Sequence, residues 1–239
     1  MPTVARSAAE LIRLLEGSAA IDGDRLTITD AGAFRARTAR DLAWTTAFSE
    51  DPPTVEGARW LVWEASQALG ARSASMHDLY MARGRGEVHG FTVPAVNIRA
   101  QTFDMARVLF ETAARQDVWA VIAELARSEQ TYTYQRPTEY ATTVLAGALA
   151  AGWRGPVFLQ GDHYQFNARK YTADPEGMTE EIRRAIQLAL VEAGYRNIDI
   201  DSSTVEFFLP TSPISPPTLV VSPGRSRRRM SAVSSPARR

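Results

Sequence analysis

The sequence predicts an α/β protein with a parallel β-sheet at its centre, and three observations lead to this fold class. Four short runs of nearly continuous apolar residues recur between residues 75 and 204. Stretches with apolar residues at helical spacing separate these runs, which indicates amphipathic helices. The runs follow one another about every 30 residues, which is the size of a βαβ unit. Strands of parallel sheets are covered on both faces and are therefore apolar throughout, as these runs are.

The expected elements follow in a regular order. A short helix, MHDLYMARG, comes first, with Ser75 as its expected N-cap. The expected strands are GFTVPAVNI (90–98), VWAVIAELA (118–126), GPVFLQG (155–161) and NIDIDSS (197–203). The expected helices between them are TFDMARVLFETAARQ (102–116), PTEYATTVLAGALAAGW (137–153) and MTEEIRRAIQLALVEAG (178–194). We expect no α-helix after the fourth strand.

The sequence pattern of residues 1–72 predicts a small, mainly helical extension that precedes the repeating strands and helices. SAAELIRLLEG begins with a serine suited to capping, and Gly17 ends that helix. A turn at 22–24 between short apolar pieces favours a hairpin, and Pro52 and Pro53 separate two further helices. The expected core residues of the extension are Phe34, Trp60 and Trp63. Nothing in this segment indicates chemistry.

Residues 205–239 predict a disordered or loosely attached tail, because they are rich in Pro, Ser and Arg and have no amphipathic period. They carry six arginines against one acid, Glu206, which leaves 21 basic and 26 acidic residues in 1–204. The net charge of zero therefore combines a mildly acidic body with a strongly basic tail.

Composition excludes several classes of protein. The chain has no cysteine, so it forms neither disulfides nor thiolate metal sites. No run approaches the roughly 18 apolar residues of a membrane span, and the N-terminus lacks the apolar core of a signal peptide. With 45% hydrophobic and 23% charged residues, the composition is typical of a globular protein, and we expect a cytoplasmic address without a membrane partner.

Polar residues follow all four expected strands, at the end where α/β proteins place their functional groups. A polar residue after one strand is the ordinary case, because loops face water. Four such groups at one edge are a stronger indication of a site. They are Asn97 and Arg99; Glu124, Arg127, Ser128 and Glu129; Gln160, Asp162, His163 and Gln165; and Asp199, Asp201, Ser202 and Ser203.

The dipeptide Asp162-His163 is the most specific of these features. A neutral imidazole is a good ligand for a divalent metal such as zinc, and a neighbouring carboxylate can donate or accept a proton. The alternative is that both side chains satisfy backbone groups of the loop. A zinc site needs at least three protein ligands. His77 and His89 precede the first strand, at the opposite end, so the remaining ligands are missing.

Three segments carry a resemblance to a known family. GFTVPAVNI resembles the first-strand motif of class II (zinc-dependent) ketose-bisphosphate aldolases, where a Gly-aromatic pair leads into VPAxN. GPVFLQGDH resembles their third-strand motif, and AGYRNIDIDSST is similar to the segment AG(F/Y)xxxxxDxS that follows. The resemblance covers roughly residues 75–204, within an expected half-barrel domain of residues 73–204. It extends to the non-catalytic subunits of tagatose-bisphosphate aldolases.

The resemblance implies a (β/α)8 TIM barrel and a reversible retro-aldol cleavage of a sugar-phosphate substrate in carbohydrate metabolism. By position, His163 resembles the first zinc ligand, and Asp162 resembles the acid that exchanges a proton with the substrate hydroxyl. Asn97 and Ser128 resemble substrate-binding residues, and zinc is the implied cofactor. Asp201 and Ser202 match the family pattern without an assigned step.

The rest of the family's site lies in the second half of the barrel, which the resemblance does not cover. A complete (β/α)8 domain needs about 250 residues, and only about 130 follow Ser75 before the composition changes. We therefore expect a C-terminally truncated or frameshifted aldolase-like chain that is inactive alone. Its open sheet edges predict homo-oligomers or self-association.

Two other functions stay open. An aldolase-related assembly subunit without catalysis would need no complete metal site. The arginines of the tail could bind nucleic acid, although no aromatic residues lie among them and no binding fold surrounds them. Nucleic acid is therefore the less favoured partner.

Overall fold

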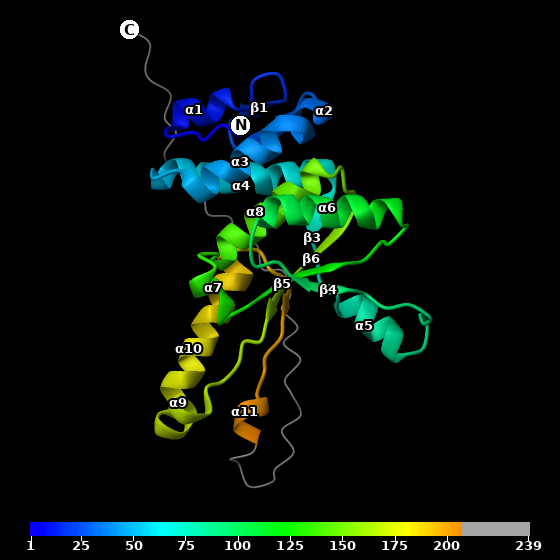
Figure 1. Cartoon of the computed structure of the whole chain (residues 1–239), viewed down its shortest axis with the longest axis vertical. Coiled ribbons are helices and arrows are strands. Elements are labelled where there is room, and N and C mark those ends of the chain that lie inside the picture. Colours follow the sequence, from blue (N-terminus) through cyan, green and yellow to red (C-terminus); the bar gives the residue numbers. More distant parts are fainter. Residues whose placement is uncertain (207–239) are drawn as a thin grey trace.

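The computed structural model describes residues 1–206 and has a parallel sheet flanked by helices, which confirms the α/β class (Figure 1). Four strands follow the order β3-β6-β5-β4, and β7 also pairs with β6, so that five strands form the sheet. All these pairs are parallel. The strands are β3 (Ala71–Ser73), β4 (Ala95–Asn97), β5 (Ile122–Ala126), β6 (Gly155–Asp162) and β7 (Asn197–Ile198).

The helices between the strands are close to those that the sequence predicts. Between β4 and β7 the main ones are α6 (Thr102–Arg115), α8 (Pro137–Ala150) and α10 (Pro175–Gln187), which continues as a π-helical turn, η2 (Leu188–Glu192). Shorter helices are α5 (His77–Gly84), α7 (Glu129–Tyr132), α9 (Ala168–Ala173) and α11 (Ser203–Glu206). The Ser75 hydroxyl accepts a hydrogen bond from the His77 backbone N–H at the start of α5. α11 corrects the expectation that no helix follows the fourth strand.

Strand β3 was not predicted, and it pairs with the beginning of β6, at Gly155–Val157. Gly70 ends the preceding helix in the left-handed conformation, with φ of 86°, and turns the chain toward the sheet. β3 has only three residues, and one of them is a charged arginine, so the sequence shows no apolar run at this place. The strand therefore depends on its partner β6 rather than on a local pattern.

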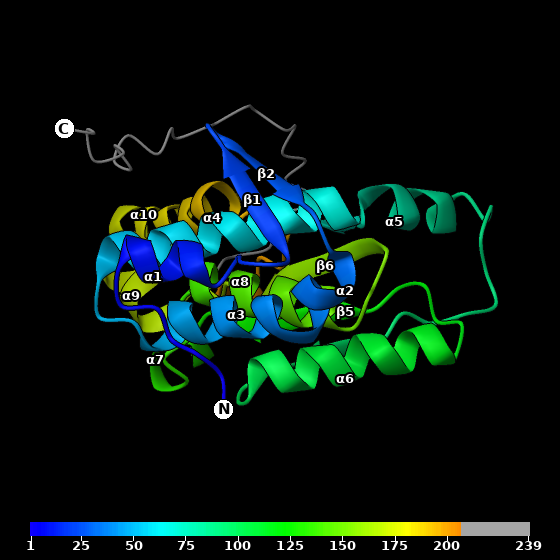
Figure 2. The same ribbon diagram turned by 90° about the horizontal axis from the view of Figure 1, so that it is seen from above.

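The N-terminal segment forms the expected helices and hairpin. Its elements are α1 (Ala8–Arg13), β1 (Ala19–Asp22), β2 (Arg25–Ile28), α2 (Ala31–Ala33), the π-helical η1 (Phe34–Thr38), α3 (Ala39–Phe48) and α4 (Pro52–Leu69). β1 and β2 pair antiparallel. This segment lies at the top in Figure 1, and Figure 2 looks down onto it. α3 and α4 both contact α8. Phe34 is fully buried, whereas Trp60 and Trp63 are partly buried at the edge of the core.

One hydrophobic core joins the N-terminal helices to one face of the sheet. It includes Leu61 and Val62 of α4, Phe110 of α6 and the strand residues Leu125 and Leu159. The division at residue 72 stays a prediction, because the buried cluster extends across it. In the described part of the chain, no helix is both long and apolar enough to span a membrane. The tail predicted for 205–239 lies, after Glu206, outside the described residues.

The other face of the sheet changes in character along the strands. Side chains of paired residues point to the same face, and alternate residues of one strand point to the same face. Near the beginning of the strands, Ile122 pairs with Phe158, and both belong to a small apolar cluster with Met76. The next row is polar and consists of Asn97, Glu124, Gln160 and Asn197. The last row holds Ala126 and Asp162, so polar chemistry is concentrated at the carboxyl end.

Candidate functional site

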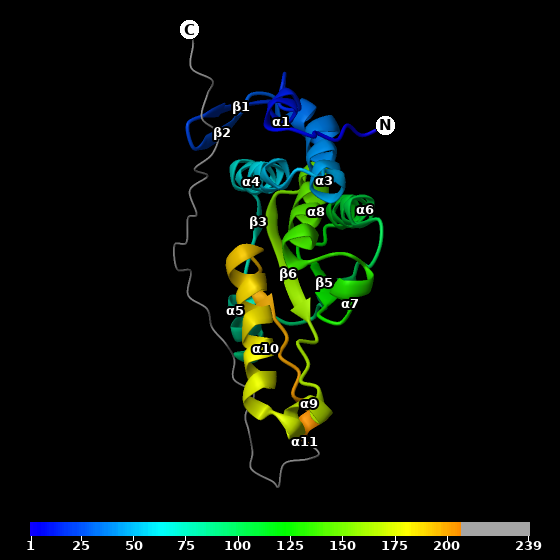
Figure 3. The same cartoon turned by 90° about the vertical axis from the view of Figure 1, so that its left-hand side faces the viewer.

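Asp162 is the last residue of β6, and the chain turns sharply at His163. The His163 backbone has φ of 45°, in the left-handed region that histidine adopts more often than most residues. Behind this turn, the ring of Tyr164 is fully buried and anchors the loop. Its backbone N–H donates to the Asp199 carbonyl at 2.8 Å. In Figure 3 the β6 arrow points away from α3 and α4, so this edge lies far from the N-terminal helices.

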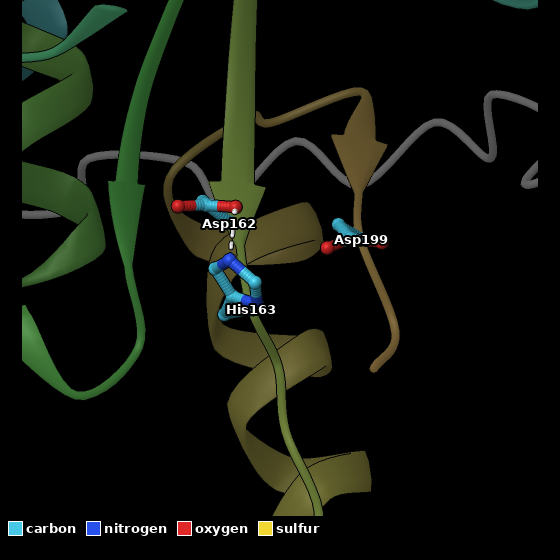
Figure 4. A group of neighbouring side chains, drawn as sticks. All are labelled: Asp162, His163 and Asp199. Carbon is cyan, nitrogen blue, oxygen red and sulfur yellow. Dashed lines mark ion pairs between the residues drawn. The ribbon is translucent and has the colours of Figure 1, made fainter. Parts of the chain in front are cut away.

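Asp162, His163 and Asp199 come together at this edge (Figure 4). Each offers one ligand atom, and these atoms all lie within 4.8 Å of one another. Nε2 of His163 lies 3.7 Å from Oδ1 of Asp162. The His163 side chain is 60% exposed and that of Asp162 is 15% exposed. The three groups are therefore accessible from solvent, with Asp162 the deepest.

Asp201 orients the imidazole of His163. Its Oδ2 lies 3.1 Å from Nδ1 of His163 and accepts a hydrogen bond from Gln165 Nε2 at 2.8 Å. Its Oδ1 accepts the Ser203 backbone N–H at 2.9 Å. A carboxylate on Nδ1 favours the tautomer that leaves the lone pair on Nε2, which is the arrangement of metal-binding histidines. The hydrogen bond that His163 makes to Asp201, followed by the charge of Asp162, raises the pKa of His163.

The same contacts act on Asp201. Burial favours its neutral form, but the hydrogen bonds from Ser203, His163 and Gln165 outweigh burial and lower the pKa of Asp201 to about 2. The ionised carboxylate is therefore the form that the fold stabilises.

Replacing Asp201 with asparagine should flatten the acid side of the stability curve. An unfolded aspartate has a pKa of about 3.9. Between about pH 4 and pH 2, residue 201 is therefore protonated in the unfolded state but still ionised in the folded state. The unfolding free energy contributed by Asp201 is thus present above pH 4 and lost as the pH falls toward 2. We expect D201N to lose about 1–2 kcal/mol at neutral pH and to show a smaller pH slope in urea unfolding. An unchanged slope would contradict the stabilising role of this carboxylate.

Asn97 links Asp162 to a second, buried acid. Its Nδ2 donates to Asp162 Oδ2 at 3.0 Å and lies 3.3 Å from Glu129 Oε2. Glu129 also accepts the Ala126 backbone N–H at 3.1 Å and pairs with Arg99. Burial raises the pKa of Glu129, yet the hydrogen bonds from Ala126 and Arg99 outweigh it and lower the pKa overall. Glu129 therefore stays ionised and helps to hold Asn97 against Asp162.

Glu124 is a further buried acid, one row below Asp162. Gln160 donates a hydrogen bond to it at 2.8 Å. Burial, followed by the negative charge of Asp162, raises the pKa of Glu124, and the Gln160 hydrogen bond opposes the rise. The floor of the site thus contains a carboxyl group that protonates more readily than an ordinary glutamic acid.

The structure brings together three of the four predicted site residues, and the fourth stands apart. Asn97, Asp162 and His163 form one connected group. Ser128 precedes α7 and is exposed, its side chain does not cap that helix, and no hydrogen bond between Ser128 and this group is present in residues 1–206. The sequence pattern places Asp199, Asp201 and Glu129 after expected strands, but it assigns them no role. Only the fold shows which of them reach His163 or Asn97.

The donor set fits zinc. One imidazole and two carboxylates are hard-to-borderline ligands, and catalytic zinc sites use three protein ligands and leave one position open. Bonds of about 2.0–2.2 Å to a tetrahedral ion place two ligand atoms about 3.4 Å apart, close to the His163–Asp162 separation. His77 lies at the start of α5 and His89 in the exposed segment after it, and neither belongs to this group.

Comparisons of the chain with protein-family models, curated proteins and solved structures found no match.

Proposed function

We propose that residues 73–204 form the first half of a (β/α)8 barrel with a class II aldolase-like, zinc-dependent site. The observation that carries this proposal is the group Asp162, His163 and Asp199 at the carboxyl edge of a parallel sheet, with Asn97 bonded to Asp162. The order β4-β5-β6-β7 supports the barrel, since consecutive parallel strands are neighbours in such folds. The proposed reaction is the reversible retro-aldol cleavage of a ketose phosphate.

In this proposal His163 and Asp199 are two of the metal ligands, and a further ligand comes from the second half of the barrel, as the resemblance implies. Asp162, which lies close to the ion position, is kept as the proton acceptor, and Asp201 fixes the His163 ring. Bound zinc would polarise the ketose carbonyl as a Lewis acid. Asp162 would take the proton from the hydroxyl group next to the bond that breaks, and return it in the reverse direction. Asn97 would keep Asp162 Oδ2 in place, because its amide already donates to that atom at 3.0 Å. Ser128 stays a proposed substrate contact of the rim, and a cytoplasmic address suits this chemistry.

Exposure of His163 favours a second candidate function. Catalytic groups work best where water is excluded, and this side chain is 60% exposed. We therefore propose that a single chain is poorly active or inactive, and we retain a non-catalytic aldolase-related assembly subunit as the alternative.

An aldol-cleavage assay tests the enzymatic proposal. The full chain is loaded with zinc and incubated with fructose or tagatose bisphosphate, and triose phosphate is measured. We expect a slow, zinc-dependent release of triose phosphate by the wild-type chain. In D162N the rate of this release should be lower by ~10²-fold or more, because the proton acceptor is lost while the side-chain shape is kept. A chain that neither binds zinc nor releases triose phosphate would instead support the assembly subunit.

A further inference from the structure

The outer side of β4 is an open sheet edge within residues 1–206. On its inner side, the Ile122 N–H donates to the Pro94 carbonyl at 2.9 Å, and the Ile98 N–H lies 3.3 Å from the Glu124 carbonyl. Backbone groups of successive residues point to opposite sides of a strand, so those of Ala95 and Asn97 point away from β5. No described strand pairs with them. Unpaired edge groups of this kind are a template for another strand.

The rows of the sheet indicate which strand would fit there. A strand that continues the sheet beyond β4 should carry a polar residue level with Asn97 and a ligand-type residue two positions later. β7, at the other end of the same sheet, has Asn197 in the same row as Asn97 and Asp199 two residues later. We propose that a second copy of this chain docks at this edge, with β4 of each copy beside β7 of the other. The inference rests on the barrel of the proposed function.

A two-fold axis makes both junctions equivalent and closes the sheet. Four strands of each copy, β4 to β7, give the eight parallel strands at which side chains just fill a barrel. In such a pair the same patch of both copies forms the contact, so the β4 side of one copy must fit the β7 side of the other.

Apolar side chains near the edge would gain cover in the pair. Met105 and Val108 of α6 are 50% and 46% exposed. α5 contains no buried residue and exposes Tyr80 and Met81. It is attached to the segment before β4, since Arg83 donates to the Phe91 carbonyl at 2.8 Å. Two helices near the edge therefore offer unpartnered apolar surface.

The pair would also complete the candidate site. The carboxyl ends of all eight strands would lie at the same end of the barrel. Each group of Asp162, His163 and Asp199 would then face the strand ends of the other copy. The exposed His163 of a single chain would then lie inside a shared cleft. Two acidic groups at one mouth repel each other, and bound zinc reduces this repulsion.

Sedimentation equilibrium of the zinc-loaded full chain tests the pair. We expect a mass twice the 26.3 kDa of one chain at micromolar concentration. A95P removes an edge N–H that points away from β5, and it should weaken the pair at least tenfold, whereas A95T keeps the N–H and should leave it intact. The double variant M105E/V108E tests the same face without a backbone change and should also weaken the pair. Circular dichroism verifies that each variant folds.

A monomeric wild-type chain at high concentration, or a pair that neither A95P nor M105E/V108E weakens, would overturn the inference. Zinc binding is measured on the same samples to separate the two proposals. A monomer that binds zinc contradicts the pairing and leaves the proposed function standing. A pair that binds no zinc contradicts the proposed function and leaves the pairing standing.

Discussion

H163A should lower the affinity of the full chain for Zn²⁺ by more than about 100-fold. Loss of an outer partner of a metal ligand typically costs about 10–100-fold, and loss of the ligand itself should cost more. His163 is the sole imidazole of the group with Asp162 and Asp199, and its Nε2 faces Asp162 while Asp201 holds Nδ1. Without the ring, two carboxylates remain, and these suit zinc less well than a mixed donor set.

Competition against a chromophoric chelator measures this affinity. H77A is the matched control, because His77 lies at the start of α5 and outside the group, and it should bind zinc as the wild type does. D201N should fall between the two, since it keeps the ligand His163 but replaces the negatively charged acceptor on Nδ1 with a neutral amide. Equal affinities of wild type and H163A would place the zinc elsewhere on the chain.

Y164A should destabilise the protein by about 3–5 kcal/mol, which is the usual cost of truncating a buried aromatic residue. Tyr164 is fully buried directly after the Asp162-His163 turn. Its ring also packs against Gly161, where a Cβ atom would collide with it. The truncated variant should therefore lose both stability and the fixed position of His163.

Y164F separates packing from hydrogen bonding. The Tyr164 hydroxyl lies 3.3 Å from Gln130 Nε2, a long contact, so removing it should cost only about 1 kcal/mol. Urea unfolding gives both values, and the zinc titration is repeated on the folded fraction. Similar losses in Y164A and Y164F would show that the ring does not support the core in the way described.

The sequence predicts the central site residues because their signal is local. Asp162 and His163 are adjacent and follow an apolar run, so no knowledge of distant residues is needed. Asp199 and Asp201 lie more than 30 residues away, and only the pairing of β6 with β7 brings them to His163. Glu129 likewise acquires its role through Asn97, 32 residues earlier. The prediction for Ser128 rests on the alignment of a motif. A shift of one position along a loop is enough to turn a side chain away from the group of Asn97, Asp162 and His163.

The same distinction applies to the fold. Helix ends follow from caps that can be recognised locally, such as Asp51 and Gly70 around α4. Strand lengths depend on partners. The predicted strand 197–203 is a regular ladder only at Asn197–Ile198, because the partner strand turns at His163. Beyond that point the two segments are joined by isolated backbone hydrogen bonds. In these, the Tyr164 N–H donates to the Asp199 carbonyl and the Phe166 N–H donates to the Asp201 carbonyl at 3.1 Å.

Anomalous diffraction at the zinc edge, on crystals of the zinc-loaded full chain, tests the central claim most directly. The account predicts one strong peak per chain within bonding distance of His163 Nε2 and an Asp199 carboxylate oxygen, with Asp201 still on Nδ1. A peak confined to His77 or His89, or no peak at stoichiometric zinc, would contradict the claim that this strand edge is a metal site.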